Sequence, residues 1–333
     1  MGPLRIGAAC GSPIPFLEGL PQLSDLVVSP VVLGLWPIAG VTSVGVTPEL
    51  SRQTIRAALD AGVTTFDTAF SYGYDGESDR LLGEMLAAGS SRRREGCVVI
   101  SKVGQRWTAD RKRVTDASPA TLVADAEDSL RRIGIERFDL LMLHSVDPEI
   151  DVRRSIEALE GLRERGLAAR IGLCNADFPA LLAAAEAGPL SAVQWPLNLL
   201  QREVLDRRVE WCREQGIAVH TYWGLMKGLL AGRIDRQHVF DPGDSRPGYA
   251  IYQGAARERA HRVIDRLRQL GEEAELTVAQ LSLGWVLSQP GVSSVLVGAK
   301  RPEQIRETAR ARPLSPELVA EIDAAVGASG WKA

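Results

Sequence analysis

An aspartate and a tyrosine, Asp67 and Tyr72, lie five residues apart where an apolar run meets a glycine-bearing loop. Lys102 ends a second apolar run, "CVVISK", and His144 ends a third. Because an unpaired ammonium is costly near a buried strand end, Lys102 requires an anion beside it, and Asp67 is the neighbour that could supply one. A carboxylate, an amine, a phenol and an imidazole in one place suit the donation of a proton to a carbonyl oxygen.

Each of these residues would have a distinct part in that chemistry. The charge of Lys102 is expected to lower the pKa of Tyr72 from its usual value of about 10. A neutral His144 could donate a hydrogen bond to the substrate carbonyl. Taken singly, Asp67 could be a turn cap, Tyr72 a half-buried ring and His144 a structural histidine. Four such residues at consecutive strand ends favour one site, and further apolar runs end at Asn175, Gln194 and Tyr222.

The elements that must position these residues alternate along the chain. Short β-branched or aliphatic runs and longer segments of helical periodicity follow one another about eight times. Strands are predicted at 31–35, 63–67, 97–102, 138–144, 170–174, 192–195, 217–222 and 293–298. Helices are predicted at 49–61, 119–133, 152–165, 178–187 and 278–289. This alternation predicts an α/β fold with parallel strands, either a closed (β/α)8 TIM barrel or an open doubly wound sheet.

Composition limits the classes of protein to consider. The 333 residues are 45% hydrophobic with a net charge of -3, which gives no electrostatic footprint for nucleic acid. The basic run Arg111-Lys112-Arg113 is interpreted as solvated loop charge. Residues 1–20 are predicted to be a loosely ordered extension and 21–333 a single barrel, with 233–252 as a long loop of the kind that covers a site. Without a membrane-spanning run, and with four separated cysteines that suit no metal site, we expect a cytoplasmic protein with reduced thiols.

From about residue 20 to residue 326 the sequence resembles the aldo-keto reductases. "FDTAFSYGYDGESDRLLGEML" is similar to that family's Asp-Thr-Ala, Tyr-Gly and Ser-Glu-x-x-Leu-Gly signature, with Asp79 where glutamate is usual. "VVISKVG", "LLMLHSVDP" and "IGLCNAD" resemble its lysine, histidine and Gly-x-Ser-Asn segments. "VQWPLNLLQRE", "TYWGLMKGLLAGR", "FDPGDSRPGY" and "VLVGAKRPEQIRET" are similar to the branch with bacterial barrel reductases and potassium-channel β subunits.

The resemblance implies a (β/α)8 barrel that binds NADPH without a Rossmann domain, and no G-x-G-x-x-G motif opens a helix here. It implies that Asp67, Tyr72, Lys102 and His144 are a catalytic tetrad with Tyr72 as general acid. The cofactor contacts that it implies are Gly34, Trp36, Cys174, Asn175, Gln194, Tyr222, Leu225, Gly298, Lys300, Arg301, Gln304 and Thr308.

Within this cofactor set the implied roles differ. Cys174, Asn175 and Gln194 would hydrogen-bond the nicotinamide carboxamide, and Tyr222 would stack on its ring. The adjacent cations Lys300 and Arg301 would meet the 2′-phosphate and favour NADPH over NADH.

Three positions depart from the family pattern. Cys174 replaces the usual serine and is a weaker hydrogen-bond partner, Thr308 replaces a common asparagine, and Trp223-Gly224 stands where Ser-Pro is frequent.

Three functions fit these residues. The first is NADPH-dependent reduction of a small aldehyde or ketone, a sugar included, to the alcohol. The second is a cofactor-sensing or partner-binding subunit on the same barrel, and the third is a lyase or isomerase with Lys102 as a Schiff-base amine. The complete tetrad favours the reductase, while the sequence determines neither the substrate nor the oligomeric state.

Overall fold

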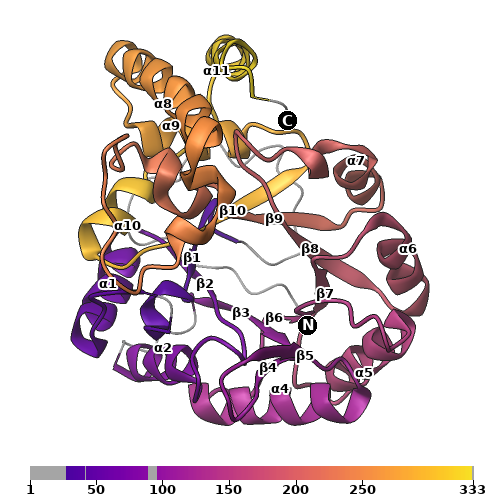
Figure 1. The fold of residues 1–333 in the computed structure, drawn as a ribbon. Coiled ribbons are helices and arrows are strands. Elements are labelled where there is room, and N and C mark those ends of the chain that lie inside the picture. The colour runs from indigo at the N-terminus through magenta and orange to yellow at the C-terminus, as the bar shows by residue number, and fades with distance from the viewer. Residues whose placement is uncertain (1–27, 42, 89–95, 332–333) are drawn as a thin grey trace, which may run out of the picture.

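Eight parallel strands close into a barrel in the computed structural model, which describes residues 28–41, 43–88 and 96–331 (Figure 1). In spatial order the strands run β1-β10-β9-β8-β7-β6-β3-β2. The TIM barrel prediction is therefore confirmed and the open sheet is wrong, while the predicted extension 1–20 lies outside the described residues. The strands are β1 (Val31–Gly34), β2 (Thr65–Asp67), β3 (Val98–Val103), β6 (Leu140–Leu143), β7 (Ile171–Cys174), β8 (Leu190–Pro196), β9 (Ala218–Tyr222) and β10 (Val292–Gly298).

Helices surround the barrel, and their buried apolar residues form one core with residues of the strands. The five predicted helices are confirmed to within two residues at their ends. Several begin at the residue types that satisfy free backbone N–H groups, as where Thr47, Asp177 and Thr277 accept hydrogen bonds from the first turn. The helices are α1 (Pro48–Asp60), α2 (Glu77–Ala88), α4 (Pro119–Ile133), α5 (Val152–Glu164), α6 (Phe178–Ala187), α7 (Arg207–Glu214), α8 (Gly254–Ala274), α9 (Val278–Leu287), α10 (Pro302–Thr308) and α11 (Pro316–Ala328).

Alternation along the strands decides which side chains enter the barrel. Val98, Ile100, Leu140 and Met142 belong to a buried cluster separate from the larger core beneath the helices. Because side chains alternate along a strand, the next inward position on β3 is Lys102, and the position after Met142 is His144. The same period places Asp67, Cys174, Gln194 and Tyr222 on the inner face at or near the C-terminal ends of their strands.

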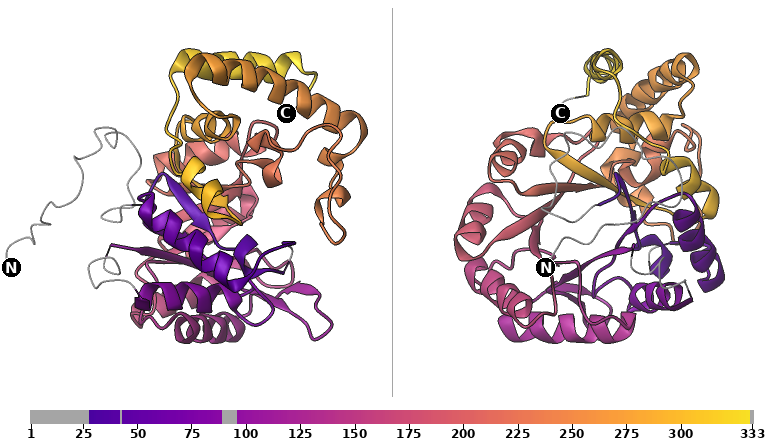
Figure 2. Two further views of the ribbon diagram at one scale, coloured as in Figure 1. Left: turned by 90° about the vertical axis from the view of Figure 1, so that its left-hand side faces the viewer. Right: turned by 180° about the vertical axis from the view of Figure 1, so that it is seen from behind.

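Two chain excursions rise around the C-terminal ends of the strands. After β3 the chain forms an antiparallel hairpin, β4 (Gln105–Trp107) with β5 (Arg113–Thr115), which sequence periodicity did not predict. After β9 follow the 3-10 turns η3 (Met226–Ala231), η4 (Arg246–Gly248) and η5 (Ala250–Tyr252), so that 233–252 is irregular as predicted. The left view of Figure 2 shows both excursions on the same end of the barrel. Among the described residues, no helix is long and apolar enough to cross a lipid bilayer.

Candidate active site

A buried ion pair joins β2 to β3 at the mouth of the barrel. Lys102 Nζ lies 2.5 Å from Asp67 Oδ1, and both side chains are 1% exposed. The amine also donates to the carbonyl oxygen of Thr68 at 3.0 Å and to Tyr72 Oη at 3.3 Å. The second carboxylate oxygen of Asp67 accepts a hydrogen bond of 3.0 Å from Gln194 Nε2. The anion expected beside Lys102 is thus Asp67, and the amine connects that carboxylate to the phenol.

Protonation of the pair follows from burial and from proximity. Burial by itself lowers the pKa of Lys102, but the charge of Asp67 opposes this and the net pKa is raised, so the amine stays protonated. Burial raises the pKa of Asp67, while Lys102 and Gln194 act against that rise. A protonated Lys102 is a hydrogen-bond donor and a poor nucleophile.

Tyr72 reaches Lys102 through a tight turn after β2. Gly73 has φ 110°, a left-handed conformation, and an added Cβ would meet the side chain of Glu77, so glycine is required there. Burial raises the pKa of Tyr72 above 10, and this outweighs the opposite effects of Lys102 and Arg113. The expectation that the pKa of Tyr72 falls is therefore wrong. The hydroxyl remains protonated at neutral pH and can act as a proton donor.

His144 lies beside Tyr72 at the end of β6, with ring centres 5.8 Å apart. Burial and then the charges of Lys102 and Arg113 hold the pKa of His144 well below 6.5, so the ring is neutral. Its Nε2 lies 3.3 Å from Arg113 Nη2. Because a guanidinium only donates, Nε2 is the acceptor in this contact and the ring proton lies on Nδ1.

The hairpin brings residues to the site that sequence reasoning missed. Trp107 and Arg113 are opposite each other in the β4–β5 register. Trp107 Nε1 donates to the carbonyl oxygen of Ser71 at 2.9 Å, and the Trp107 ring stacks on Trp36 with centres 6.4 Å apart. Arg113 is exposed, as the interpretation as solvated charge predicts, but its guanidinium contacts Ser71 and His144, whereas Lys112 beside it is 79% exposed and paired with Asp110. The alternation of Gln105 and Trp107 was a signal for the hairpin, but a three-residue run is too short for periodicity to detect.

Three strand ends next to the tetrad form a connected polar edge. Asn175, in a left-handed conformation at φ 59°, donates from Nδ2 to the carbonyl oxygen of His144 at 2.9 Å. Its Oδ1 accepts a hydrogen bond of 2.6 Å from Tyr222 Oη. The carbonyl oxygen of Gln194 accepts a hydrogen bond of 3.1 Å from the backbone N–H of Asn175. Cys174 points into the barrel instead, where its sulfur lies 3.7 Å from Met142 Sδ and burial raises its pKa to about 12.

Four other predicted cofactor residues lie at or just after the C-terminal ends of β1, β9 and β10. Gly34 pairs in register with both Asp67 and Gly298, and an added Cβ on Gly298 would meet Pro37. Trp36 packs edge-on against Tyr72 with centres 5.3 Å apart. Leu225 is half-buried just after β9.

The segment after β10 presents two cations next to a helix start. The Gln304 side chain accepts from the backbone N–H groups of Lys300 and Arg301, at 2.8 and 3.2 Å. Lys300 is half-buried and Arg301 exposed, and within the described ranges neither forms an ion pair. Thr308 is 3% exposed and its hydroxyl donates to the carbonyl oxygen of Gln304, so its side chain faces its own helix.

Asp79, which stands where the family pattern has glutamate, lies behind the site. It is fully buried and accepts hydrogen bonds from Thr68 Oγ1 at 2.7 Å and Ser129 Oγ at 2.6 Å. The carbonyl oxygen of Thr68 accepts a hydrogen bond from Lys102, so Asp79 holds in place a residue that contacts the catalytic lysine. Burial raises the pKa of Asp79 to about 6.

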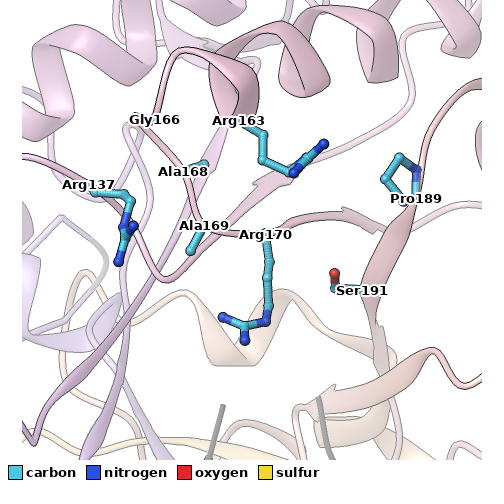
Figure 3. Close-up of a pocket in the computed structure, with 8 residues that line it drawn as sticks. All are labelled: Arg137, Arg163, Gly166, Ala168, Ala169, Arg170, Pro189 and Ser191. Carbon is cyan, nitrogen blue, oxygen red and sulfur yellow. The ribbon is translucent and has the colours of Figure 1, made fainter. Parts of the chain in front are cut away.

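A separate pocket of about 550 Å³ opens at the opposite end of the barrel (Figure 3). Arg137, Arg163 and Arg170 line it, near the N-terminal ends of β6, β7 and β8. No tetrad residue contributes to its wall. It is therefore distinct from the polar groups at the strand ends.

Comparisons with known proteins agree with this geometry. Residues 30–326 match the Aldo/keto reductase family. The NADH-specific methylglyoxal reductase of Escherichia coli is 32% identical over 307 residues, 86% of this chain and 91% of that protein. An aldo-keto reductase of Bacillus subtilis, YhdN, is 29% identical over 85% of this chain and 84% of its own length. The glycerol dehydrogenase structure from Gluconobacter oxydans has a TM-score of 0.85 at 28% identity, covering 93% of this chain and 94% of that one. The chain belongs to the aldo/keto reductase family and is an NAD(P)H-dependent oxidoreductase.

Proposed function

We propose that this enzyme reduces the carbonyl group of a small aldehyde or ketone to the alcohol, with NADPH as the hydride source and Tyr72 as the general acid. The observation that carries the proposal is the contact of one buried amine with both a carboxylate and a phenol. Lys102 Nζ lies 2.5 Å from Asp67 and 3.3 Å from Tyr72 Oη. This arrangement stabilises negative charge on the phenol oxygen at the moment when its proton leaves.

The parts of the protein divide the reaction as follows. Tyr72 Oη gives its proton to the carbonyl oxygen, while a bound nicotinamide cofactor would supply the hydride to the carbonyl carbon. Lys102, held protonated by Asp67, stabilises the phenolate that results. Gln194 restrains the other oxygen of Asp67 and thereby the orientation of the pair. The rings of Trp36 and Trp107 form a wall that excludes water from one side of the phenol.

The chain has groups that fit a nicotinamide dinucleotide. Asn175 and Tyr222 lie together at neighbouring strand ends and offer an amide and a ring to the nicotinamide. Lys300 and Arg301, the latter exposed, are available to a phosphate after β10. The relative from Escherichia coli is named as NADH-specific, so cofactor choice differs among relatives. Two cations without carboxylate partners in the described part of the chain favour NADPH, which carries the additional phosphate.

The names of relatives support small oxygenated substrates. One relative is named a methylglyoxal reductase and another is named a glycerol dehydrogenase. A lyase or isomerase that uses Lys102 as a Schiff-base amine is disfavoured, because that chemistry needs an unprotonated amine and the pKa of Lys102 is raised.

Oxidation of NADPH with 4-nitrobenzaldehyde tests the proposal, with the unaltered protein and Tyr72→Phe compared side by side. We expect kcat to fall by about 10²- to 10⁴-fold in the variant, the usual contribution of a positioned acid. The Kd for NADPH, measured by fluorescence titration, should change little because the hydroxyl is the only group removed. If the unaltered protein binds NADPH and reduces no member of a wider carbonyl panel, the proposed reductase is wrong and a cofactor-sensing subunit replaces it.

A further inference from the structure

One cation at the mouth of the barrel has no part in the proposed reaction. Arg113 begins β5, and its Nη2 lies 3.3 Å from Ser71 Oγ and 3.3 Å from His144 Nε2. Its guanidinium lies over the Trp36 ring at 5.0 Å from the ring centre. The end of this side chain therefore lies above Tyr72 and His144, where a substrate must enter.

Arg113 faces the site without a carboxylate. Two other arginines that follow barrel strands are paired with carboxylates, Arg106 with Asp125 and Arg246 with Asp244. Within residues 28–41, 43–88 and 96–331, Arg113 forms no such ion pair, and its partners are a hydroxyl, a neutral imidazole and an aromatic face. Burial of the guanidinium lowers the pKa of Arg113, although the residue as a whole is exposed. The guanidinium is thus in contact with neutral groups alone, while part of the residue remains open to solvent.

The charges around the tetrad do not cancel. Asp67 is directed to Lys102 and Gln194, so its charge is satisfied inside the barrel. Arg113 therefore keeps a positive charge that no carboxylate of the described residues pairs with, beside the place where a carbonyl oxygen would contact Tyr72. Charge complementarity favours a substrate with a carboxylate, which accepts paired hydrogen bonds from a guanidinium.

The contact with His144 fixes how far that carboxylate is from the reacting carbon. Arg113 Nη2 donates to Nε2 of His144, the residue that is expected to contact the carbonyl oxygen. Because the two nitrogens are 3.3 Å apart, a carboxylate oxygen bound to Arg113 and a carbonyl oxygen bound to His144 would lie within a few ångströms of each other. Atoms on the carbon directly bonded to the carbonyl carbon lie at that distance, whereas a carboxylate on the far side of a ring does not.

We propose that Arg113 binds a carboxylate attached to the reacting carbonyl carbon, so that this site takes 2-oxo carboxylates as its substrate class. The proposal rests on the reductase function proposed above and makes Arg113 the residue that determines specificity. Trp107, opposite Arg113 in the hairpin, and Trp36 beneath its guanidinium hold the charge at this position. When the carboxylate binds, Nη2 of Arg113 releases His144 Nε2, and the neutral ring donates to the carbonyl oxygen once its proton has moved from Nδ1 to Nε2.

Matched pairs of substrates test the proposal. Pyruvate and methyl pyruvate share a 2-oxo group, but only pyruvate carries a negatively charged carboxylate beside it. 4-Carboxybenzaldehyde and 4-nitrobenzaldehyde also differ by one carboxylate, which lies across the ring from the aldehyde. The ratio of kcat/KM for pyruvate to that for methyl pyruvate is measured in the unaltered enzyme, Arg113→Met and Arg113→Lys. Lys112→Met is the control, since it removes an adjacent positive charge that is paired with Asp110 in solvent.

We expect the ratio to fall by about 30- to 100-fold in Arg113→Met, the usual loss when a hydrogen-bonded charge pair is broken. Arg113→Lys should recover part of that loss, and Lys112→Met should alter the ratio by less than about threefold. The preference should be much weaker for the benzaldehyde pair. A pyruvate to methyl pyruvate ratio that changes equally in Arg113→Met and Lys112→Met would overturn the proposal. In that case, reduction of methyl pyruvate by the unaltered enzyme would show that the proposed reductase function still holds.

A binding measurement separates the two proposals if no substrate turns over. Oxamate carries a carboxylate beside a carbonyl and cannot be reduced by hydride in this way, and its binding is followed by tryptophan fluorescence because Trp36 lies under Arg113. Saturable binding that Arg113→Met abolishes and Lys112→Met retains supports the anion site. Absence of binding in the unaltered, folded protein contradicts it, whether or not neutral carbonyls are reduced.

Discussion

The tetrad and the segment after β10 are both polar regions at one end of the barrel, and they differ in how their charges are satisfied. At the strand ends, Lys102 and Asp67 satisfy one another at 1% exposure. After β10, Gln304 holds the backbone of Lys300 and Arg301 while both cations remain without an ion pair in the described residues. In the first region each charge already has its ion-pair partner within the protein. In the second the backbone is held by hydrogen bonds, and the two positive charges are free to bind a phosphate.

This difference follows from the physical environment of each region. A buried charge is stable only with its partner in place, so the reacting groups must be preorganised by the fold itself. A charge near solvent keeps its hydration and can wait for a phosphate at little cost. Substitutions in the first region should therefore alter folding and chemistry together, whereas those in the second should alter ligand binding alone.

Lys102→Met is the strongest test of that contrast. It leaves the Asp67 carboxylate buried without its cation, which typically costs about 3–5 kcal/mol of unfolding free energy. Because Tyr72 also loses its partner, we expect kcat to fall by about 10³-fold or more. Urea unfolding and single-turnover kinetics measure the two effects.

The double variant Asp67→Asn with Lys102→Met is the control, since it removes both charges and should recover much of the stability but none of the activity. If Lys102→Met is as stable as the unaltered protein, the ion pair is not what holds this strand end. Lys112→Met, in solvent, should change unfolding by no more than about 0.5 kcal/mol.

Asp79→Asn sharpens the comparison within the buried region, because Asp79 is as buried as Asp67 and has only hydroxyl partners. Its pKa in the folded chain is raised from 3.8 to about 6. The folded state therefore binds the proton more tightly, and the stability from this group is present below pH 3.8 and lost as pH rises through about 6. A shift of two units corresponds to ~3 kcal/mol.

We expect the unfolding free energy of the unaltered protein, relative to Asp79→Asn, to decrease by this amount between about pH 4 and pH 7. Asp67 and the other carboxyls are common to both proteins, so the difference isolates Asp79. Parallel stability curves for the two proteins would contradict the raised pKa.

The strand-end residues could be predicted from sequence for a simple reason. Polar residues that end apolar runs must lie at one edge of a parallel barrel, and the two-residue period then sends Asp67, Lys102 and His144 inward. The pKa of Tyr72 was predicted in the wrong direction because sequence reveals the neighbouring charge of Lys102 but not the depth of burial, which has the larger effect.

The hairpin escaped prediction because each of its strands has only three residues. In sequence, Arg113 is one member of a basic run, and nothing local distinguishes it from Lys112 beside it. Its direction depends on pairing with Trp107 across the turn and on the contact of that ring with Trp36. Long-range contacts of this kind are what the linear pattern lacks, and the buried orientation of Thr308 is a second example.

Replacement of Lys300 and Arg301 is the mildest test and addresses the second region directly. Lys300→Gln and Arg301→Gln should each weaken NADPH binding by about tenfold, while the Kd for NADH changes by less than about twofold, because only NADPH carries the 2′-phosphate. Titration of both cofactors by fluorescence measures the ratio, and Arg306→Gln, an exposed charge in α10, is the matched control. Unfolding free energy should be the same in all three variants, since none of these charges has a partner whose burial depends on it. Equal weakening of NADPH binding and NADH binding would mean that these residues contact a part that both cofactors share. The contrast between the buried ion pair and the unpaired cations after β10 would then hold, but it would carry no preference for NADPH.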